Sequence, residues 1–368
     1  MNEIWEEQLH REVVDEFEDR KSSTTALIQS YQRLGMYERA DKVSLCGTDL
    51  QFVKSMDPNE SAKLLRANFC KDRLCWMCSW RRTKKIFGQV SQVMSKLEQE
   101  KEYRFVFVTL TVRSCAGPNL IDELDQMLSA FHKFNQRTRI KKAFKGGFRT
   151  LEVRYHPEHP TEFQFHHHLH IVYAVTKSYF NSRYYVSHDE IMQIWRDCCG
   201  IDYDPYVHIE IVKPSVGDDG EIGYNQVVAE VAKYTVKPED IYVGRTDEEI
   251  DRGVWYLSQG LASRRLCSFT GVFKQAAAEL KLDDLTEGDL VHTDFEKVRT
   301  DVAHMIIHYK WRVGYGYERV MVKHVTDEQI AEKEREHADR GARSRISRKV
   351  WREKVKTVNA SRIPRKPV

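Results

Sequence analysis

The sequence lacks any apolar run long enough to span a membrane, and its acidic, polar N-terminus does not have the pattern of a signal peptide. These absences argue against a membrane protein and favour a cytoplasmic one. Because the cytoplasm is reducing, we expect the eight cysteines to bind metal rather than to form disulfides. The net charge is small, at +3 over 368 residues, but it is unevenly distributed along the chain.

The basic charge is concentrated at the C-terminus. From Arg340 to the end there are eleven Lys or Arg residues and a single acid, Glu353. A basic tail of this kind is a common electrostatic footprint for nucleic acid, although a solvated, disordered end would have the same composition. The length allows two or three modules, and a hydrophobic content of 41% is sufficient for a core.

Four cysteines form a spaced group in the first quarter of the chain. Cys70, Cys75 and Cys78 follow a C-x4-C-x2-C pattern, and Cys46 precedes them. Thiolates suit zinc, and four of them make a closed tetrahedral site that is structural rather than catalytic. Buried free thiols are the alternative, which the strongly polar flanking residues disfavour.

The region around these cysteines is basic. Eight Lys or Arg residues and one acid lie between Lys63 and Lys85, with Trp76 and Trp80 among them. Basic and aromatic residues around a zinc site suit a nucleic-acid surface, so we expect DNA contacts here. The candidate residues are Arg73, Arg81, Arg82 and Lys84, and a second basic run covers 137–145.

A histidine-rich segment, 163–175, is the most informative stretch of the chain. Its apolar residues predict a strand that enters a core. Side chains alternate along a strand, so His166, His168 and His170 share one face and His167 points the other way. Burying several imidazoles is costly unless a partner such as a divalent metal satisfies them. The alternative is a polar strip on a half-solvated strand.

A second strand, 148–155, precedes this one and is predicted to form a hairpin with it. If the turn centres on residue 160, antiparallel pairing places Glu152 opposite His168, on the same face. His168, His170 and Glu152 then form a candidate ligand set for catalytic Mn2+ or Mg2+, with positions left open. His166 is a further candidate ligand. An exposed surface carboxylate is the alternative for Glu152.

A helix is predicted over 225–237, ended by Pro238. Glu230, Tyr234 and Lys237 are spaced i, i+4 and i+7, so they share a helix face, and Lys233 adds a cation nearby. A tyrosine oxygen with an acid one turn away and cations beside it is a usable nucleophile. Most helical Tyr–Glu pairs are surface residues without such a role, so this helix alone is weak support for an enzyme.

The order of predicted elements indicates an α+β fold. Strand, helix, strand, strand, helix, strand is the split βαβ pattern of a ferredoxin-like antiparallel sheet, to which one helix is appended. Such a sheet places its two middle strands centrally, with the histidines on the open sheet face and the Tyr234 helix able to cover them. We divide the chain into a helical extension (1–42), a zinc-binding basic segment with a helix (43–100), the sheet domain (101–285) and a helical C-terminal region with the basic tail (286–368).

In this order, the motifs resemble those of rolling-circle plasmid replication initiators, the Rep proteins of the HUH endonuclease superfamily, over about residues 43 to 280. The resemblance implies an HUH nuclease core on the predicted sheet and a structural Zn2+ in the cysteine segment. One departure is His167, where the family often has proline. The matching segments are Cys46…Cys70-x4-Cys75-x2-Cys78, Phe107-Val-Thr-Leu-Thr-Val112, Leu151-Glu152, 165–170, Glu230-x-x-Lys-Tyr234-x-x-Lys237 and Gly260-Leu-Ala-Ser-Arg-Arg265…Gly271-Val-Phe-Lys274.

What this resemblance implies is a nick in one DNA strand at a plasmid origin. Tyr234 would attack the scissile phosphate and keep a 5′-phosphotyrosine link, and the freed 3′-OH would prime synthesis by a host polymerase. Glu230 would activate water to end the cycle, while Lys233 and Lys237 would contact phosphate or lower the proton affinity of the tyrosine. The implied partners are single-stranded or hairpin origin DNA, a host helicase and polymerase, and a second copy in a homodimer.

Other classes fit part of the pattern. A non-catalytic zinc-containing nucleic-acid-binding protein would use the basic regions without nicking. A single-tyrosine transposase or a conjugative relaxase would share the histidine strand, but a relaxase usually has its nucleophile near the N-terminus, where this chain has only Tyr31 and Tyr37. A zinc hydrolase is disfavoured because His168 and His170 form a strand pair rather than a helical one.

Overall fold

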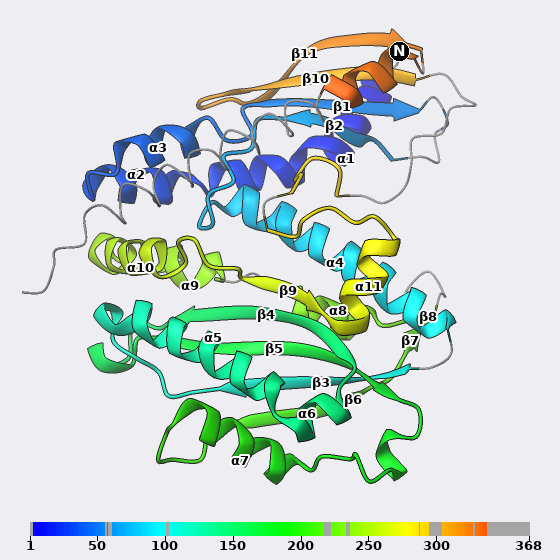
Figure 1. Ribbon diagram of the computed structural model, residues 1–368. Helices are drawn as coiled ribbons and strands as arrows, with labels where there is room; N and C mark the ends of the chain where they lie inside the picture. Colours follow the sequence, from blue (N-terminus) through cyan, green and yellow to red (C-terminus); the bar gives the residue numbers. More distant parts are fainter. Residues whose placement is uncertain are drawn as a thin grey trace, which may run out of the picture. The chain divides into compact units, whose positions relative to one another are not determined.

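The structure is a computed structural model (Figure 1). It describes residues 3–336 except 56, 58–60, 101–102, 217–221, 233–235, 287, 294–303 and 327. Two compact units divide the chain. One contains 1–14, 48–68 and 296–368, and the other contains 15–47 and 69–295. The first helix, α1 (Glu3–Ser22), begins in one unit and ends in the other.

The smaller unit contains a four-stranded antiparallel sheet in the order β11-β10-β1-β2. Its strands are β1 (Asp49–Ser55), β2 (Lys63–Ala67), β10 (His304–Arg312) and β11 (Gly316–Val325). Val53, Leu65, Ile306 and Ile330 form its core. The pairing of β1 with β10 joins two segments that the sequence analysis placed in different regions.

The expectation of a helical C-terminal region was wrong for 304–325, which forms β10 and β11, and right for 328–336. The reason is visible in β10, where Met305, Ile306, Ile307 and Tyr309 are all buried, so that both faces of the segment are covered. A short apolar run of this kind is consistent with a buried strand. The basic tail from Arg340 onward lies outside the described residues.

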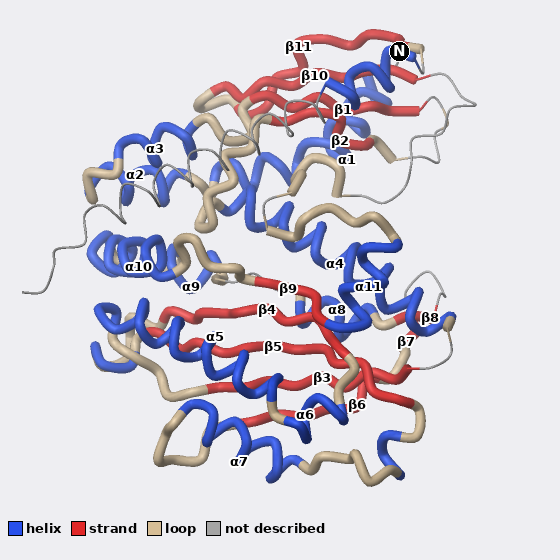
Figure 2. The backbone as a smooth tube through the Cα atoms, in the orientation of Figure 1, coloured by secondary structure: helices blue, strands red, loops and turns tan. Residues whose placement is uncertain are grey.

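The larger unit contains the predicted ferredoxin-like sheet (Figure 2). Its five antiparallel strands follow the order β6-β3-β5-β4-β9, and the first four correspond to the split βαβ pattern. The strands are β3 (Tyr103–Thr111), β4 (Gly146–Tyr155), β5 (Phe165–Thr176), β6 (Val207–Val212) and β9 (Cys267–Thr270). The short strand β9 was not predicted, and it covers the outer edge of β4.

The α+β class is confirmed, but neither face of this sheet is open. On one face, α4 (Trp76–Gln99), α8 (Asn225–Val231) and α11 (Gly271–Glu279) pack against the strands. Their buried residues, such as Val90, Val228 and Phe273, share a core with Phe107 and Val172. The expectation of an open sheet face is therefore corrected, because long apolar stripes on α4 and α11 also need burial.

The opposite face is covered by α5 (Leu120–Gln136) and α7 (His188–Cys199), which connect β3 to β4 and β5 to β6. Figure 1 shows α5 lying across the strands on this side. Trp195 of α7 is fully buried, and its indole N–H donates to the carbonyl of Thr111 at 2.8 Å. Leu124, Met127 and Phe134 of α5 are buried and form the core-facing stripe of this helix.

Most of the remaining helices are short. The extension at 1–42 is helical as expected in its described residues, which form α1, α2 and α3. A capping box between Thr246 and Glu249 begins α10. The remaining bounds are α2 (Thr25–Arg33), α3 (Tyr37–Ser44), α6 (Thr138–Ala143), α9 (Pro238–Tyr242), α10 (Asp247–Gly260), β7 (Ser215–Val216) and β8 (Ile222–Gly223).

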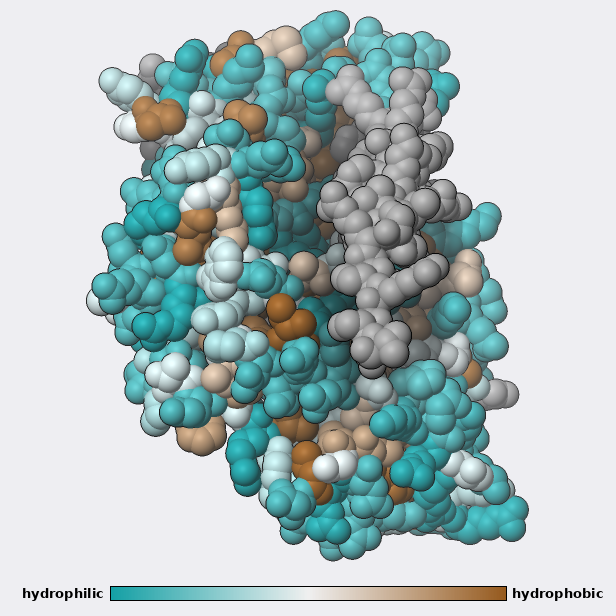
Figure 3. Space-filling view, turned by 60° about the vertical axis from the view of Figure 1, so that its left-hand side comes forward, coloured by the Kyte–Doolittle hydropathy of each residue, from teal (hydrophilic) through white to brown (hydrophobic). Residues whose placement is uncertain are grey.

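In the described part of the chain, no helix is both long and apolar enough to cross a membrane. The surface seen in Figure 3 is largely hydrophilic, with hydrophobic side chains scattered among polar ones.

Gly253 in α10 provides a test of this packing. A Cβ atom there would lie 2.7 Å from Cε1 of Tyr155, whose hydroxyl donates to the Glu249 carbonyl. We expect Gly253→Ala to lower the free energy of unfolding by about 1–3 kcal/mol through overpacking, although alanine favours helices. Thermal denaturation measures the change, and Arg252→Ala, at an exposed position of the same helix, is the control. An increased melting temperature for Gly253→Ala would contradict the packing described.

Candidate active site

Three side chains from the β4–β5 hairpin converge on one point. Glu152 pairs with His168 in the strand register, as the predicted turn position required. The Nε2 atoms of His168 and His170 lie 3.0 and 2.9 Å from Oε2 of Glu152, and 2.9 Å from each other. All three side chains are largely buried. The sequence therefore placed this triad in the correct register.

Neighbouring residues fix the orientation of His170. Its Nδ1 lies 3.1 Å from the hydroxyl of Thr109 on β3, and its ring stacks on Phe107 with ring centroids 5.5 Å apart. A hydrogen bond at Nδ1 leaves Nε2 directed at the triad, which is the usual support for a metal-binding histidine. Sequence reasoning missed Thr109, although its place two residues after Phe107 on the same strand face was a usable signal.

The triad has the geometry of a metal site. Its three atoms form a nearly equilateral triangle with sides of 2.9–3.0 Å, so one point can lie ~2.1 Å from all three. Burial would raise the pKa of Glu152, but hydrogen bonds from His168 and His170 outweigh it and hold this pKa well below its usual range. A carboxylate that stays ionised beside two imidazoles suits a divalent cation, with coordination positions left for substrate.

The two remaining histidines of the strand lie apart from the triad. His166 places Nδ1 3.2 Å from the hydroxyl of Ser114, and burial together with the neighbouring His168 lowers its pKa to about 4. His166 and His168 have ring centroids 5.2 Å apart. His167 points to the other sheet face, as predicted, where it is fully buried 4.0 Å from Oε2 of Glu123. The triad is thus complete without His166.

The predicted nucleophile helix is shorter than expected. Helix α8 ends at Val231, and Lys233 and Tyr234 lie outside the described residues. Lys237 is not on this helix, because it has an extended backbone (φ −76°, ψ 120°) and precedes Pro238, the first residue of α9. The expected helix to Pro238 was therefore wrong, since a proline disfavours helical backbone before it but is well tolerated at a helix start.

The residues on both sides of the segment 233–235 pack against the sheet face that carries the triad. On one side, Val228 and Val231 of α8 pack in the core with Phe107, and Glu230 is half-buried in the last turn. On the other side, Arg154 of β4 forms a bidentate pair with Asp240 of α9, with Nη2 donating to Oδ1 at 2.9 Å. Arg154 shares its strand face with Glu152, so this pair anchors α9 beside the triad.

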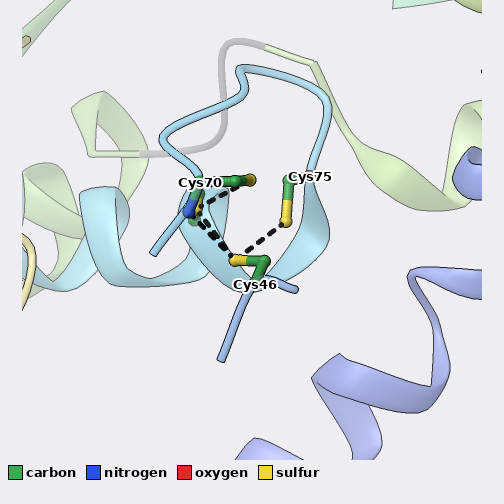
Figure 4. A group of neighbouring side chains, drawn as sticks. Cys46, Cys70 and Cys75 are labelled. Atoms are coloured by element: carbon green, nitrogen blue, oxygen red, sulfur yellow. Dashed lines mark hydrogen bonds between the residues drawn. The ribbon is translucent and has the colours of Figure 1, made fainter. Parts of the chain in front are cut away.

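The four predicted cysteines also converge, as Figure 4 shows for Cys46, Cys70 and Cys75. The Sγ–Sγ distances are 3.5 Å for Cys46–Cys78, 3.6 Å for Cys70–Cys78 and 3.7 Å for Cys46–Cys75, and all four thiols are free. Tetrahedral zinc with Zn–S bonds of ~2.3 Å requires edges of this size. The donor set therefore fits a structural zinc ion.

Backbone and charge around the sulfurs support the same conclusion. The N–H groups of Cys70, Lys71 and Asp72 donate to sulfur atoms at 3.2–3.4 Å, which stabilises thiolates. Buried Lys21 donates to the Ser44 carbonyl at 2.6 Å and lies close enough for all four cysteines to affect its pKa, although burial dominates and lowers that pKa. With zinc bound, an ammonium there would offset the excess negative charge of four thiolates. Sequence reasoning missed Lys21.

The basic residues proposed for DNA contact have different surroundings. Arg81 is 2% exposed and donates to the Leu290 carbonyl. It is therefore no longer proposed as a DNA contact. Arg73 donates to the carbonyls of Leu261 and Arg264, and Arg82 donates to that of Lys71. Both side chains therefore help to hold the backbone in place. The side chain of Lys84 is 40% exposed, beside Trp80 and Glu16.

Known proteins resemble this chain over most of its length. A family described as "Replication protein" matches residues 61–317. A "Protein rep" of Bacillus sp is 32% identical over 287 residues, covering 75% of this chain and 91% of the relative. A "Protein rep" of Streptococcus pneumoniae serotype 2 (34% identical; 74% and 82% covered) and one of Lactiplantibacillus plantarum (33% identical; 84% and 97% covered) are also similar. No solved structure matches the chain.

Proposed function

The chain belongs to the replication protein (Rep) family, and from this premise we propose that it is a plasmid replication initiator that nicks one DNA strand at an origin. The observation that carries the proposal is the convergence of Glu152, His168 and His170 on one point. A buried triad of this composition suits phosphate-ester chemistry assisted by Mn2+ or Mg2+. Structural zinc on the four cysteines would hold the preceding segment in place.

In the proposed reaction, Tyr234 is the nucleophile. Its oxygen forms a bond to the scissile phosphorus while the bond from phosphorus to the 3′ oxygen breaks, which leaves a 5′-phosphotyrosine and a free 3′-OH. A divalent ion held by Glu152, His168 and His170 would stabilise the charge that develops on the phosphate oxygens. The 3′-OH then serves a host polymerase as primer for rolling-circle replication.

Charged residues around the nucleophile have proposed roles as well. Lys237 lies three residues after Tyr234, next to α9, which Arg154 anchors to the triad strand. A cation there favours the ionised tyrosine and contacts DNA phosphate, as does Lys233. Glu230, in the last turn of α8, would take a proton from water to release the covalent link at the end of the cycle. Arg82 and Lys84 remain proposed DNA contacts, and Arg73 contributes through its charge. Recruitment of a helicase and homodimer formation remain predictions.

A covalent adduct on a denaturing gel tests the proposal. Single-stranded DNA carrying the cognate plasmid origin is mixed with protein in Mn2+ or in EDTA. We expect wild type to form an adduct only with metal, and Tyr234→Phe to form none, a loss of at least ~1000-fold, because phenylalanine has no nucleophilic oxygen. Tyr224→Phe, in the same segment and bonded through its hydroxyl to Glu98, is the matched control.

The other outcomes separate the competing functions. An adduct that persists in Tyr234→Phe would keep the nicking activity and move the nucleophile to another residue. Tight binding without cleavage in any metal would instead support the non-catalytic zinc-containing nucleic-acid-binding protein.

A further inference from the structure

A second site lies on the sheet face opposite the triad. A cavity of about 580 Å³ opens between α5, α6 and the strands β4, β5 and β9. Arg149 and Tyr173, which line it, have the opposite strand parity to Glu152 and His168, so they point to the other face. The proposed nicking reaction does not use this cavity.

The cavity is lined by a buried guanidinium that pairs with no carboxylate in the described part of the chain. Arg149 is 7% exposed, and its terminal nitrogens donate to the carbonyls of Leu266 and Arg265 at 3.3 and 3.1 Å. Its Nε is buried and has no hydrogen-bond partner among the described residues. Burial lowers the pKa of Arg149. A buried unpaired cation is costly, so an anion that reaches Nε would relieve it.

The other charged residues that line the cavity are also basic. Lys141, Lys145 and Arg265 line the cavity, and no Asp or Glu does. The first residue of α11, Gly271, also lies there, so the positive end of that helix dipole adds to the potential. Arg265 has one exposed acidic partner, Asp284, outside the lining. The cavity therefore attracts anions.

The walls are too apolar and the volume too large for a lone phosphate. Leu128, Phe131, Ile140 and Phe144 form part of the lining, and Phe131 is half-buried with Arg149 near its ring. Small-molecule sites of 300–1,000 Å³ typically combine such walls with a few polar groups. A nucleobase stacked on Phe131 would use the apolar walls, and a phosphate bound to Arg149 would use the positive charge. We propose that this cavity binds a nucleotide.

The nucleotide can come from two sources. It can be a free mononucleotide, or it can be one nucleotide of the single-stranded origin DNA, in which case the inference rests on the proposed function. Both place the same groups in the cavity. Competition between the two distinguishes them.

Calorimetric titration with 2′-deoxyadenosine 5′-monophosphate in EDTA tests the inference without any nicking. We expect saturable binding to wild type, weakened about tenfold or more in Arg149→Met because a charged hydrogen bond is lost. Methionine keeps most of the side-chain volume, and a thermal melt checks that the variant folds. Lys141→Met is a second variant at an exposed lining position, and Lys133→Met, exposed on α5 and outside the lining, is the control.

Each result is decisive. Binding that is weakened by Arg149→Met or Lys141→Met but not by Lys133→Met supports the site. If a thymidine oligonucleotide displaces the mononucleotide, the source is DNA, and if it does not, the ligand is a free nucleotide. No binding, equal binding by all variants, or inorganic phosphate binding as tightly as the nucleotide would overturn the inference. None of these results depends on Tyr234 or the triad, so failure here leaves the nicking proposal standing.

Discussion

Glu152→Gln is expected to reduce origin cleavage by at least ~100-fold, which corresponds to about 3 kcal/mol on the barrier. The carboxylate is the only anionic member of the triad, and its Oε2 lies 2.9–3.0 Å from both imidazole Nε2 atoms. Glutamine keeps the size and one oxygen but removes the charge. The divalent ion would then be held by two neutral imidazoles, with lower affinity and poorer orientation.

The measurement separates metal binding from DNA binding. Single-turnover cleavage of origin DNA is followed across Mn2+ concentrations, and DNA affinity is measured in EDTA. We expect Glu152→Gln to shift the Mn2+ requirement upward, to lower the maximal rate and to leave DNA affinity nearly unchanged. Glu162→Gln, an exposed position in the hairpin connection, should behave as wild type.

A different outcome would assign the metal to another group of residues. His156, Glu158 and His159 also bring possible ligand atoms together, but Glu158 already pairs with Arg245 at 3.1 Å and the group is largely exposed. If Glu152→Gln cleaved at the wild-type rate with an unchanged Mn2+ requirement, the triad assignment would be wrong. Loss of cleavage in Glu158→Gln would then point to the hairpin connection.

The triad was predictable because local rules determine it. Strand alternation sets the shared face of His168 and His170, and the position of the turn sets the residue opposite them. The cysteine spacing is equally local, and the family predicted from the order of motifs is confirmed. A hairpin register and a metal-ligand spacing each depend on few residues that are close in sequence.

The failures have a common physical cause, which is dependence on partners distant in sequence. Strand β9 exists because it pairs with β4, more than a hundred residues earlier, and β10 pairs with β1 over a longer separation. Arg81 looked like a surface cation because no local pattern shows that carbonyls near residue 290 receive its donors. The error at Pro238 has another cause, because a proline can either follow the end of a helix or begin one. The ion pair of Arg154 with Asp240, which holds α9 in place, shows that Pro238 begins a helix.

Cys75→Ser is expected to cause the largest loss of stability. The sulfur of Cys75 is fully buried and lies 3.7 Å from that of Cys46, inside a set whose spacing fits tetrahedral zinc. A structural zinc site contributes on the order of 10 kcal/mol, comparable with the whole stability of a domain. Cys75 is also the N-cap residue of α4, the helix that covers the triad face of the sheet. Removing one ligand therefore weakens both the cysteine segment and this helix.

We expect the variant to lose its bound zinc and to melt at least ~20 °C below wild type. Metal content per chain and thermal denaturation measure the two effects, and chelation of wild type should reproduce the lower melting temperature. Cys267→Ser is the matched control, because Cys267 is also buried but belongs to the sheet core and not to the cysteine cluster. Its expected cost is only about 1–2 kcal/mol, from placing a hydroxyl in an apolar site. If both variants melted alike and Cys75→Ser kept its zinc, the four thiols would be ordinary core residues, and the order of α4 would have to come from its packing alone.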